Sequence, residues 1–517
     1  MGKIISADAL IIGGGVTARR AAKIIAEKHS VILVSDGSGA SPYIHGLNVP
    51  LLESDSKELF LSDTMESGKW QNDPELAALL TEGSEAIAKE FADSFDRNSD
   101  GTYDLLKPLG SSVPRVAGIG GRTGALVLAE LSREKTYTEL SATRALSLIK
   151  HNGAVCGAML YDRKAGRHFP VFARAVLIAT GGFGGIFRFS TNSADIGGDG
   201  VAMAYDVGAE LVDMEFIQYE PTVAVSPDKL IGRSIITTML FEGAVMRNAD
   251  GERFMDEKVG KDALSLGIYK EILSGKATKN GGVFYDMTGV DPELLIGKYK
   301  DYFKRYEAHG IDIRTEPVEI APAPHTTMGG IKIDTCCRSN VEGLFAAGEA
   351  AGGVHGANRL GGNAGLEVFV FGDTAGRSIS KYLDEEGRTA DFSSIEGYED
   401  AYDEIVDVQR EREELRSLLD DSMGVIKCEQ SLNSALCRAK KILDRVRNCA
   451  RSYDAVRLKN DVVTAMIAIS AAMERKSSVG SHYRSDGIEE TEKYSIEIKK
   501  SGEQMQIRRR LLKGALR

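Results

Sequence analysis

Residues 8–34 read DALIIGGGVTARRAAKIIAEKHSVILV, and this stretch decides the expected fold. An apolar run at residues 9–12 is followed by three glycines, residues 13–15, by a helical pattern, and by a second apolar run at residues 31–34. Such short apolar runs are typical of buried parallel strands. The stretch therefore predicts a strand–helix–strand unit with G-x-G-x-x-A at its first turn.

The glycine-rich turn of this unit is a candidate dinucleotide site. Glycines let a pyrophosphate approach the backbone, and a helix N-terminus offers amide groups and a favourable dipole to an anion. The acid that would bind the ribose belongs directly after the second strand, where a serine stands with an aspartate one residue later. The cofactor-binding residues predicted here are Gly13, Gly14, Gly15, Val16, Thr17, Ala18, Ser35 and Asp36.

The composition limits the classes of protein. The chain has 517 residues, 43% hydrophobic and 27% charged, which fits an ordinary globular protein of two or three domains. A net charge of −11 and a single Trp argue against a nucleic-acid binder. No stretch reaches the roughly 18 apolar residues of a membrane span. Because residues 1–6 lead directly into a strand pattern, we expect no signal peptide and a cytoplasmic protein.

The cysteines do not indicate a metal centre. They form no C-x-x-C pair, and adjacent Cys336 and Cys337 would point to opposite faces of a strand. We expect reduced thiols, no metal ligands and no iron–sulfur cluster on this chain. The six are Cys156, Cys336, Cys337, Cys428, Cys437 and Cys449.

Other elements follow from apolar spacing. The 56 glycines gather in several clusters, which suggests one extended ligand that many loops touch. Strands are predicted at residues 154–161, 171–180 and 341–346, and a hairpin at 493–511. Helices are predicted at residues 76–95, 122–134, 262–274, 292–308 and 363–383, with a long helical region at 398–475.

Later motifs are more specific. TGG follows a predicted strand at residues 180–182, HTTMGG stands at residues 325–330, and HGANRLGGN at residues 355–363. Together with the first motif, they resemble the flavoprotein subunits of succinate dehydrogenase and fumarate reductase, a family that includes L-aspartate oxidase. The resemblance runs through nearly the whole chain. It also includes GDG at 198–200, NADGERF at 248–254 and SHYR at 481–484.

This resemblance implies an α/β fold class: a Rossmann-like FAD-binding domain with an inserted α+β capping domain and a C-terminal helical domain. The FAD-binding domain would consist of residues 1–219 and 331–390, and the cap of residues 220–330. The helical domain would span residues 391–478, and residues 479–517 would form a C-terminal hairpin and basic tail.

The resemblance also implies FAD. Many members attach it covalently to a histidine in the loop after the second strand. Here Ala40 stands at that position and the nearby histidine is displaced, so we expect noncovalent FAD and an ordinary polar histidine near the flavin. The further cofactor residues implied are His45, Thr180, Gly181, Gly182, Asp199, Glu349, Asn363, Ala364 and Gly365.

The implied chemistry is reduction or oxidation of a carbon–carbon bond. It needs a hydride carrier, a proton donor, and groups that clamp the substrate carboxylate. By position, His325 and Arg359 would form the clamp. Two positions depart from the family: Glu220 replaces the histidine of His-Pro-Thr, and Lys261 replaces the proton-donating arginine. Glu242, in the place of the family's Thr-Glu-Gly glutamate, would relay the proton.

These departures bear on the substrate. A glutamate at residue 220 would repel a second substrate carboxylate, so we expect a small carboxylate other than plain fumarate or succinate. Lysine can still donate a proton but lacks the arginine fork. The alternatives are a solvated Lys261 on the cap and a Glu220 that serves as structural partner of Lys261 or Arg233. Two other functions also stay open: an electron-transfer subunit without substrate chemistry, and an amino-acid oxidase.

We further expect an iron–sulfur electron-transfer partner in a multisubunit complex, which would place the protein peripherally at the inner face of a membrane. The last ten residues, 508–517, contain five basic side chains and no acid. Such a cluster suits docking to an acidic partner or an anionic membrane. A solvated tail is the alternative.

Overall fold

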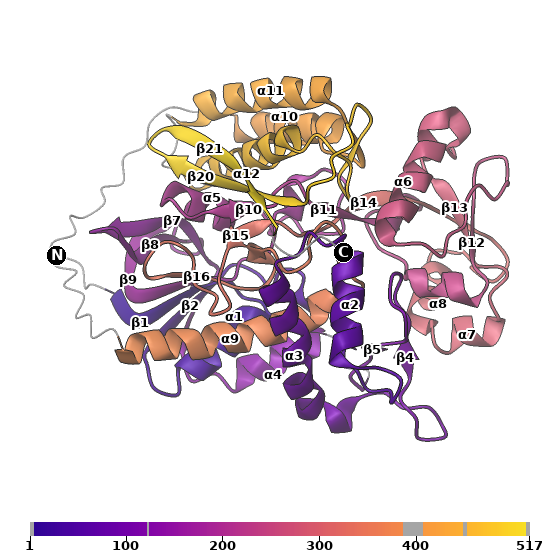
Figure 1. The fold of residues 1–517 in the computed structure, drawn as a ribbon, viewed down its shortest axis with the longest axis horizontal. Coiled ribbons are helices and arrows are strands. Elements are labelled where there is room, and N and C mark those ends of the chain that lie inside the picture. Colours follow the sequence, from indigo (N-terminus) through magenta and orange to yellow (C-terminus); the bar gives the residue numbers. More distant parts are fainter. Residues whose placement is uncertain (1–4, 121–123, 386–406, 448–451, 513–517) are drawn as a thin grey trace.

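The computed structural model describes residues 5–120, 124–385, 407–447 and 452–512. Figure 1 shows a large sheet with its helices on the left, a smaller α+β part on the right, and a helical part at the top. The large sheet and the helical part share one hydrophobic core, while the α+β part has a core of its own. This arrangement confirms the predicted α/β fold class with a C-terminal helical region.

The predicted strand–helix–strand unit lies at the centre of the large sheet. β1 pairs in parallel with β2 on one side and with β9 on the other, and the strand order is β6-β2-β1-β9-β8-β7, with β16 beside β9. Leu10 and Leu33 are fully buried, as expected for strands covered on both faces. The elements are β1 (Ile5–Ile12), α1 (Val16–Ile25), β2 (Val31–Ser35), β6 (Thr138–Ser141), β7 (Thr143–His151), β8 (Ala154–Asp162), β9 (Arg167–Ile178), β16 (Leu344–Ala346) and α9 (Asn363–Glu385).

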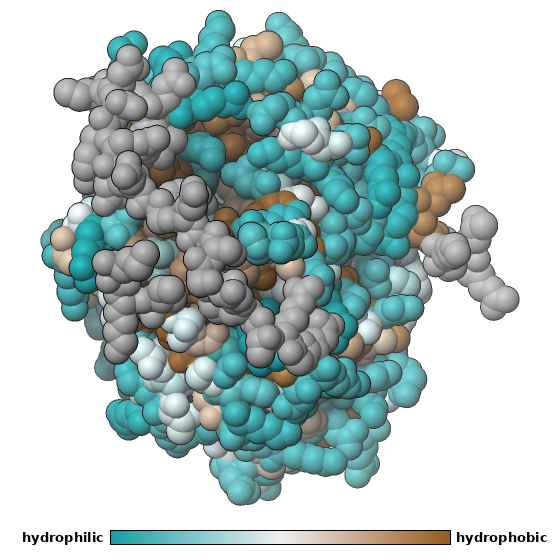
Figure 2. Space-filling model, turned by 90° about the vertical axis from the view of Figure 1, so that its left-hand side faces the viewer, coloured by the Kyte–Doolittle hydropathy of each residue, from teal (hydrophilic) through white to brown (hydrophobic). Residues whose placement is uncertain are grey.

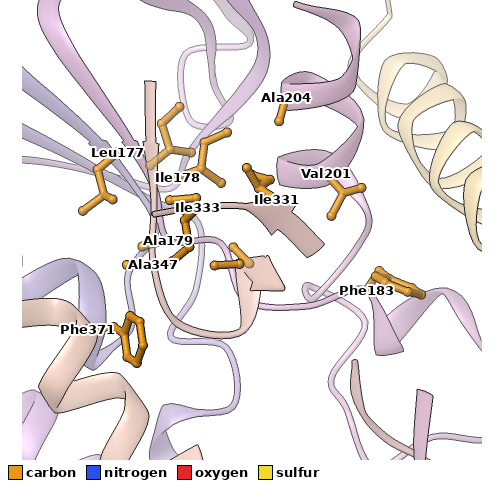
Figure 3. Packing of buried hydrophobic residues seen from close by; sticks show 14 of the residues in the cluster. Leu177, Ile178, Ala179, Phe183, Val201, Ala204, Ile331, Ile333, Ala347 and Phe371 are labelled. Carbon is orange, nitrogen blue, oxygen red and sulfur yellow. The ribbon is translucent and has the colours of Figure 1, made fainter. Parts of the chain in front are cut away.

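The carboxyl end of β9 is held by packing with a second layer. Figure 3 shows Ile178 close to Ile331, with Val201 and Ala204 of a neighbouring helix behind it. This packing fixes the turn at residues 179–181, at the sheet edge where ligands of α/β proteins bind. The second layer consists of α5 (Asp199–Asp206) and a sheet with β10 (Leu211–Val212), β15 (Gly330–Lys332), β17 (Ala351–Gly352), β20 (Tyr494–Ser501) and β21 (Gln504–Leu511).

The α+β part, which we call the cap, is built on an antiparallel sheet. Its strand order is β11-β14-β13-β12, and β11 and β14 carry the chain into and out of it. The predicted domain boundary at residue 220 falls inside β11. The cap contains β11 (Ile217–Ala224), β12 (Val245–Arg247), α6 (Lys261–Glu271), β13 (Val283–Asp286), α7 (Pro292–Ile296), α8 (Lys300–Glu307) and β14 (Val318–Thr327).

Predicted helices mostly form, with two changes. The helix expected at residues 292–308 is divided into α7 and α8, because Gly297 ends α7 in a non-helical conformation. The helical region 398–475 forms three helices where the structure describes it. The elements are α3 (Pro74–Glu90), α4 (Gly124–Arg133), α10 (Val408–Ser422), α11 (Glu429–Arg447) and α12 (Tyr453–Glu474).

The predicted C-terminal hairpin forms as β20 and β21. Its basic residues are neutralised within the chain: Arg508 contacts Glu497, and Arg509 contacts Glu474. Arg510 likewise lies 2.9 Å from a carboxylate oxygen of Glu497. The described part of the basic cluster is therefore an ordered, ion-paired strand, whereas residues 513–517 lie outside the described ranges.

The surface and the helices can be compared with what a membrane-spanning protein requires. The face shown in Figure 2 is predominantly hydrophilic. Within the described ranges, no helix combines the length and the apolar character that crossing a bilayer requires.

Candidate active site

A cavity of about 530 Å³ lies between the carboxyl edge of the large sheet and the cap. The first turn after β1, the loop after β2 and the turn after β9 line one side. The cap and the segment before α9 line the other. Its wall therefore combines the predicted nucleotide site with most of the predicted catalytic residues, among them Glu220, Lys261, His325 and Arg359.

The turn between β1 and α1 leaves room only for glycine. Gly13 has a φ of 143°, and a Cβ there would lie 2.1 Å from the carbonyl oxygen of Ala179. A Cβ on Gly14 would lie 2.1 Å from the carbonyl oxygen of Gly37. A helix begins directly after the turn, and its first amides have no partner within the helix. This close, amide-rich cradle fits the pyrophosphate of a dinucleotide such as FAD.

The strand alternation decides which residue reaches the ribose end. Asp36 lines the cavity, and its carboxylate accepts from Arg163 at 2.6 Å and from Arg144 at 3.2 Å. Ser35 does not line the cavity, contrary to the prediction. Successive side chains of a strand point to opposite faces, and the Ser35 hydroxyl instead donates to Glu139 at 3.1 Å.

Asp199 lines the cavity, but its carboxylate is already held. Arg144 donates to it at 2.5 Å and 2.9 Å, and the side-chain amide of Asn460 donates at 3.1 Å. Asp461 lies nearby in α12, and burial together with the charge of Asp199 raises the pKa of Asp461 to about 6. Asp199 therefore positions Arg144 beside the nucleotide end of the cavity.

Glu349 lies at the other side of the predicted flavin position. It accepts a hydrogen bond from the backbone amide of Thr327 at 2.9 Å, and burial raises its pKa to about 7. A Cβ on Gly182 would lie 2.1 Å from the Thr327 hydroxyl, so Gly182 permits this contact without lining the cavity. The predicted residues Gly15, Thr17, His45, Thr180, Gly181, Ala364 and Gly365 also line the cavity.

Three other predicted cofactor residues point away from it. Val16 and Ala18 are fully buried on α1 and contribute the helix start rather than a side chain. Asn363 is fully buried as well, and it accepts a hydrogen bond from Asn48 at 2.7 Å. These residues support the cavity wall from behind.

The catalytic candidates meet where β11 and β14 pair. Their antiparallel register places Glu220 opposite Ala323, two residues before His325. Lys261, the first residue of α6, brings its Nζ to 2.5 Å from Glu220 Oε2. His325 Nε2 lies 3.7 Å from the same oxygen, while its Nδ1 lies 2.8 Å from the Thr191 hydroxyl. The structure therefore brings an acid, a lysine and a histidine together.

Burial and charge set the protonation of this cluster. Burial alone would raise the pKa of Glu220, but the charges of Lys261 and His325 and the Lys261 hydrogen bond outweigh it and hold that pKa below its ordinary value. Burial lowers the pKa of His325 to about 3, although the charge of Glu220 opposes it. At neutral pH the cluster therefore contains an ionised Glu220 and a neutral His325.

Arg359 completes the site as an open cation. It is 5% exposed, and its buried Nε has no hydrogen-bond partner among the described residues. Burial lowers its pKa, while the charges of Glu220 and Glu349 act in the opposite direction. A buried guanidinium without a bound carboxylate is ready to accept one from a ligand.

Glu242, the predicted proton relay, does not line this cavity. It is the last residue of a 3₁₀ helix, Thr237–Glu242, and only the first two threonines of that helix line the cavity. Glu242 instead lies near Tyr299, whose pKa is raised first by burial and then by the charge of Glu242.

The cap is also joined to the FAD-binding part by an ion pair outside the cavity. Lys69 Nζ lies 3.0 Å from Asp262 Oδ2, and Asp262 directly follows Lys261 on α6. The first two residues of α6 are thus both ion-paired, Lys261 with Glu220 and Asp262 with Lys69.

Several lining residues had no signal in the sequence: Thr237, Thr238, Tyr302 and Arg305. Arg233, considered from the sequence only as an ion-pair partner of Glu220, also lines the cavity. They come from cap segments far apart in the chain. Within the described residues, no group of three or more His, Cys, Asp or Glu side chains is placed to hold a metal ion.

Comparisons with known proteins agree with this geometry. Residues 8–364 match the FAD binding domain family, and residues 412–495 match the fumarate reductase flavoprotein C-terminal family. An uncharacterised FAD-dependent oxidoreductase of Methanocaldococcus jannaschii is 35% identical, over 96% of this chain and 97% of its own. The first subunit of the fumarate reductase (CoM/CoB) of Methanothermobacter marburgensis is 33% identical, over 94% and 95%.

Two further comparisons extend this result. The L-aspartate oxidase of Clostridium perfringens is 32% identical, over 73% of this chain and 88% of its own. The solved structure of Mycobacterium smegmatis Sdh1 in complex with UQ1 has a TM-score of 0.86 at 27% identity, covering 100% of this chain and 96% of that one.

Proposed function

Since this chain belongs to the flavoprotein family of fumarate reductase, succinate dehydrogenase and L-aspartate oxidase, we propose that its substrate is a small carboxylate other than plain fumarate or succinate. The chain is an FAD-dependent oxidoreductase, and the reaction proposed is hydrogen transfer at a carbon–carbon bond beside the carboxylate. The observation that carries this proposal is one cavity that contains an open Arg359 and a closed Glu220–Lys261 ion pair.

Bound FAD supplies the hydride donor or acceptor for this reaction. The turn at residues 13–15 and the start of α1 would hold its pyrophosphate, and Glu349 and the segment 364–365 would border its flavin. We propose that the binding is noncovalent, since Ala40 offers no nucleophile. Acid precipitation should then release yellow flavin into the supernatant, and flavin retained on the pellet would contradict this.

Arg359 would bind and orient the substrate carboxylate. Its buried guanidinium keeps unused N–H donors, and a carboxylate accepts such donors in a bidentate pair. In the tautomer whose Nδ1 accepts from the Thr191 hydroxyl, the neutral His325 adds one N–H from Nε2. Together they would fix the carbon chain and stabilise charge that develops on the carboxylate.

Lys261 would deliver the proton. Its ammonium group gives a proton to the substrate carbon during reduction and takes one up during oxidation. Glu220, whose carboxylate oxygen lies 2.5 Å from the Lys261 Nζ, would hold the ammonium group in place and, after transfer, pass on to it a proton taken up from solvent. Two groups in contact therefore replace the single arginine that the family implies.

The same pair limits the substrate. Its charges cancel, so this part of the cavity offers no free cation to a second carboxylate near the reacting bond. Placing one there would bring it against the ionised Glu220 at low local dielectric. A neutral, hydrogen-bonding or cationic group suits this position better.

Glu220 also favours one alternative. An ammonium group on the substrate would be attracted to this carboxylate, as an amino-acid oxidase would require, and one relative is named L-aspartate oxidase. The other alternative, an electron-transfer subunit, requires no substrate binding. Release of hydrogen peroxide with amino acids would indicate the first, and absence of any substrate turnover would indicate the second.

Dye-linked turnover by the FAD-loaded protein tests the proposal. We expect activity with unsaturated carboxylates that carry a neutral β-substituent on the double bond, and poor activity with fumarate. The double variant Glu220→His, Lys261→Arg should raise fumarate turnover. Fumarate reduction by the natural protein at about 10 per second or more, the rate of an ordinary efficient enzyme, would overturn the substrate proposal.

We also propose an iron–sulfur partner protein that carries electrons to or from the flavin. The likeness to Sdh1 over the full chain supports it. Purification at native expression level should recover an iron-containing protein in constant ratio with this chain. Recovery of this chain alone, fully active with its physiological donor, would contradict it.

A further inference from the structure

Two arginines of the cap line the cavity without any carboxylate partner. Arg233 lies at the solvent-exposed mouth, and Arg305 lies half-buried on α8. Among the described residues, no ion pair and no carboxylate hydrogen bond involves either guanidinium. This is unusual in a chain whose other cavity cations outside the carboxylate clamp, Arg144 and Lys261, are ion-paired.

The two guanidinium groups belong to segments in direct contact. Arg305 donates from Nη1 to the backbone carbonyl of Ser234 at 3.0 Å, and Ser234 is the residue after Arg233. Its guanidinium carbon lies 5.1 Å from the centroid of the Tyr302 ring. These contacts fix Arg305 in place and leave most of its five N–H donors open to the cavity.

The surrounding residues do not neutralise the two arginines. His45 lines the cavity nearby, and burial followed by the charge of Arg305 lowers its pKa, so it stays neutral at pH 7. Asp301, one turn before Arg305 on α8, is exposed and lies outside the cavity wall. Among the described residues of the wall, none at this end therefore neutralises the two arginines.

Tyr302 connects this end with the catalytic cluster. Its ring carries Arg305 on one side, and the charge of Glu220 also acts on its hydroxyl. Tyr302 is therefore within reach of both Glu220 and Arg305, and Arg305 contacts the segment of Arg233. A ligand held by Arg359 would have to extend past the catalytic cluster to contact this pair.

We propose that Arg233 and Arg305 form a second anion-binding subsite, which recognises a phosphate or carboxylate group of the substrate remote from the reacting bond. The proposal rests on the proposed function, because Arg359 must hold the reacting carboxylate. It adds that the substrate is elongated, with an anionic group at each end and a neutral segment beside Glu220.

The same chemistry has a second source, the phosphates of FAD, and the experiment separates the two. Inorganic phosphate serves as the probe, and its binding to the FAD-loaded protein is measured by calorimetry, which requires no turnover. Arg233→Gln and Arg305→Gln should each weaken phosphate binding by about tenfold, the loss of a charge-assisted hydrogen bond. FAD content and melting temperature should stay unchanged.

Matched controls exist on the same segments. Lys229 and Lys304 are exposed, carry the same charge close to Arg233 and Arg305 in the chain, and do not line the cavity. Lys229→Gln and Lys304→Gln should leave phosphate binding within about twofold, as expected for screened surface charges.

Three results would overturn the proposal. The first is phosphate binding that is absent in the natural protein or unchanged in both arginine variants. The second is binding that is lost only in Arg359→Gln, which would place the anion at the carboxylate clamp. The third is loss of FAD from the arginine variants, which would assign them to the cofactor. Failure of the proposed function appears separately, as absent dye-linked turnover with phosphate binding intact.

Discussion

The two ends of the cavity treat their cations differently. At the nucleotide end, Arg144 is bound to two aspartates of the chain itself. On the cap side, Arg233, Arg305 and Arg359 have no carboxylate partner in the described structure, and only Lys261 is paired. Leaving a cation unpaired in a protein interior is costly. The difference indicates where the chain completes its own charge balance and where it leaves this to a ligand.

The comparison separates structural ion pairs from binding groups. Arg144 and its aspartates shape one wall of the cavity and are already paired with one another, so FAD binding at the nucleotide end would depend on backbone amides and close glycine contacts. The cap side depends on free guanidinium groups. Variants should therefore affect cofactor content and substrate turnover independently.

Gly13→Ala should have the largest effect, because it should prevent FAD binding at the nucleotide end. The new Cβ would lie 2.1 Å from the carbonyl oxygen of Ala179, in a backbone conformation that alanine avoids. We expect loss of bound FAD, and with it all turnover, measured as flavin absorbance per mole of protein. Gly101→Ala is the control, since this glycine also has a positive φ but its Cβ would meet nothing within 4 Å. Full FAD content in Gly13→Ala would contradict the assigned cradle.

Arg359→Gln should impair substrate binding on the cap side without affecting the nucleotide end. Removing the open guanidinium should lower kcat/KM by about 100- to 1,000-fold, the usual effect of losing one charge-stabilising donor. FAD content should stay constant. Arg377→Gln, an exposed arginine on α9, is the control for charge. Equal losses of FAD and of turnover would show that Arg359 supports the cofactor instead.

Lys261→Met tests the ion pair of the cap side. It removes the cation that pairs with Glu220 and leaves the carboxylate without a partner. Glu220 would be left buried without its cation, at a cost to the free energy of unfolding of about 3–5 kcal/mol. Adding Glu220→Gln should recover most of that loss while activity stays low. Thermal unfolding of the natural protein, the two single variants and the double variant measures the coupling between the two side chains. Lys258→Met, on the exposed segment before α6, is the control. Additive losses in the double variant would rule out the coupling.

The effect that is smallest at neutral pH concerns the protonation of His325. The folded chain holds the pKa of His325 at about 3, against an ordinary 6.5, so the unfolded chain binds a proton that the folded chain refuses. Stability should therefore fall as pH decreases from 6.5 towards 3, by up to about 1.4 kcal/mol per pH unit. Replacing His325 by Gln should flatten this slope in thermal unfolding, whereas His309→Gln, at an exposed position, should not. An unchanged slope would place the lost proton elsewhere, for example at His482.

The sequence predicted the nucleotide end well because its signals are local. The glycines of residues 13–15 stand between a strand and a helix. A Cβ on any of them would come within 2.8 Å of an atom of a neighbouring loop. Of the two neighbours Ser35 and Asp36, both named from the sequence, only Asp36 lines the cavity, because successive side chains of a strand point to opposite faces. The sequence pattern does not fix the end of this strand to a single residue, so it does not decide which of two neighbouring side chains faces the cavity.

The cap side was predictable only in part. Glu220, His325 and Lys261 were found through family motifs, and the Lys261 partner of Glu220 was among the alternatives. The open pair at the mouth was missed, since 72 positions separate Arg233 from Arg305 and only the folded cap joins them. Glu242 was misplaced because the helix that contains it lines the cavity only at its start.

The pairing of β11 with β14 makes the cap a replaceable module. Ala224 and Ile320 are cross-strand neighbours, so residues 225–319 begin and end at one place. A block with adjacent ends can be exchanged during evolution, or by design, without cutting the main sheet. Outside the block lie Glu220, His325 and Arg359; inside it lie Arg233, Lys261 and Arg305. With the proposed roles, the carboxylate clamp would stay with the flavin fold in such an exchange, while the proton donor and the recognition of the distal group would travel with the module.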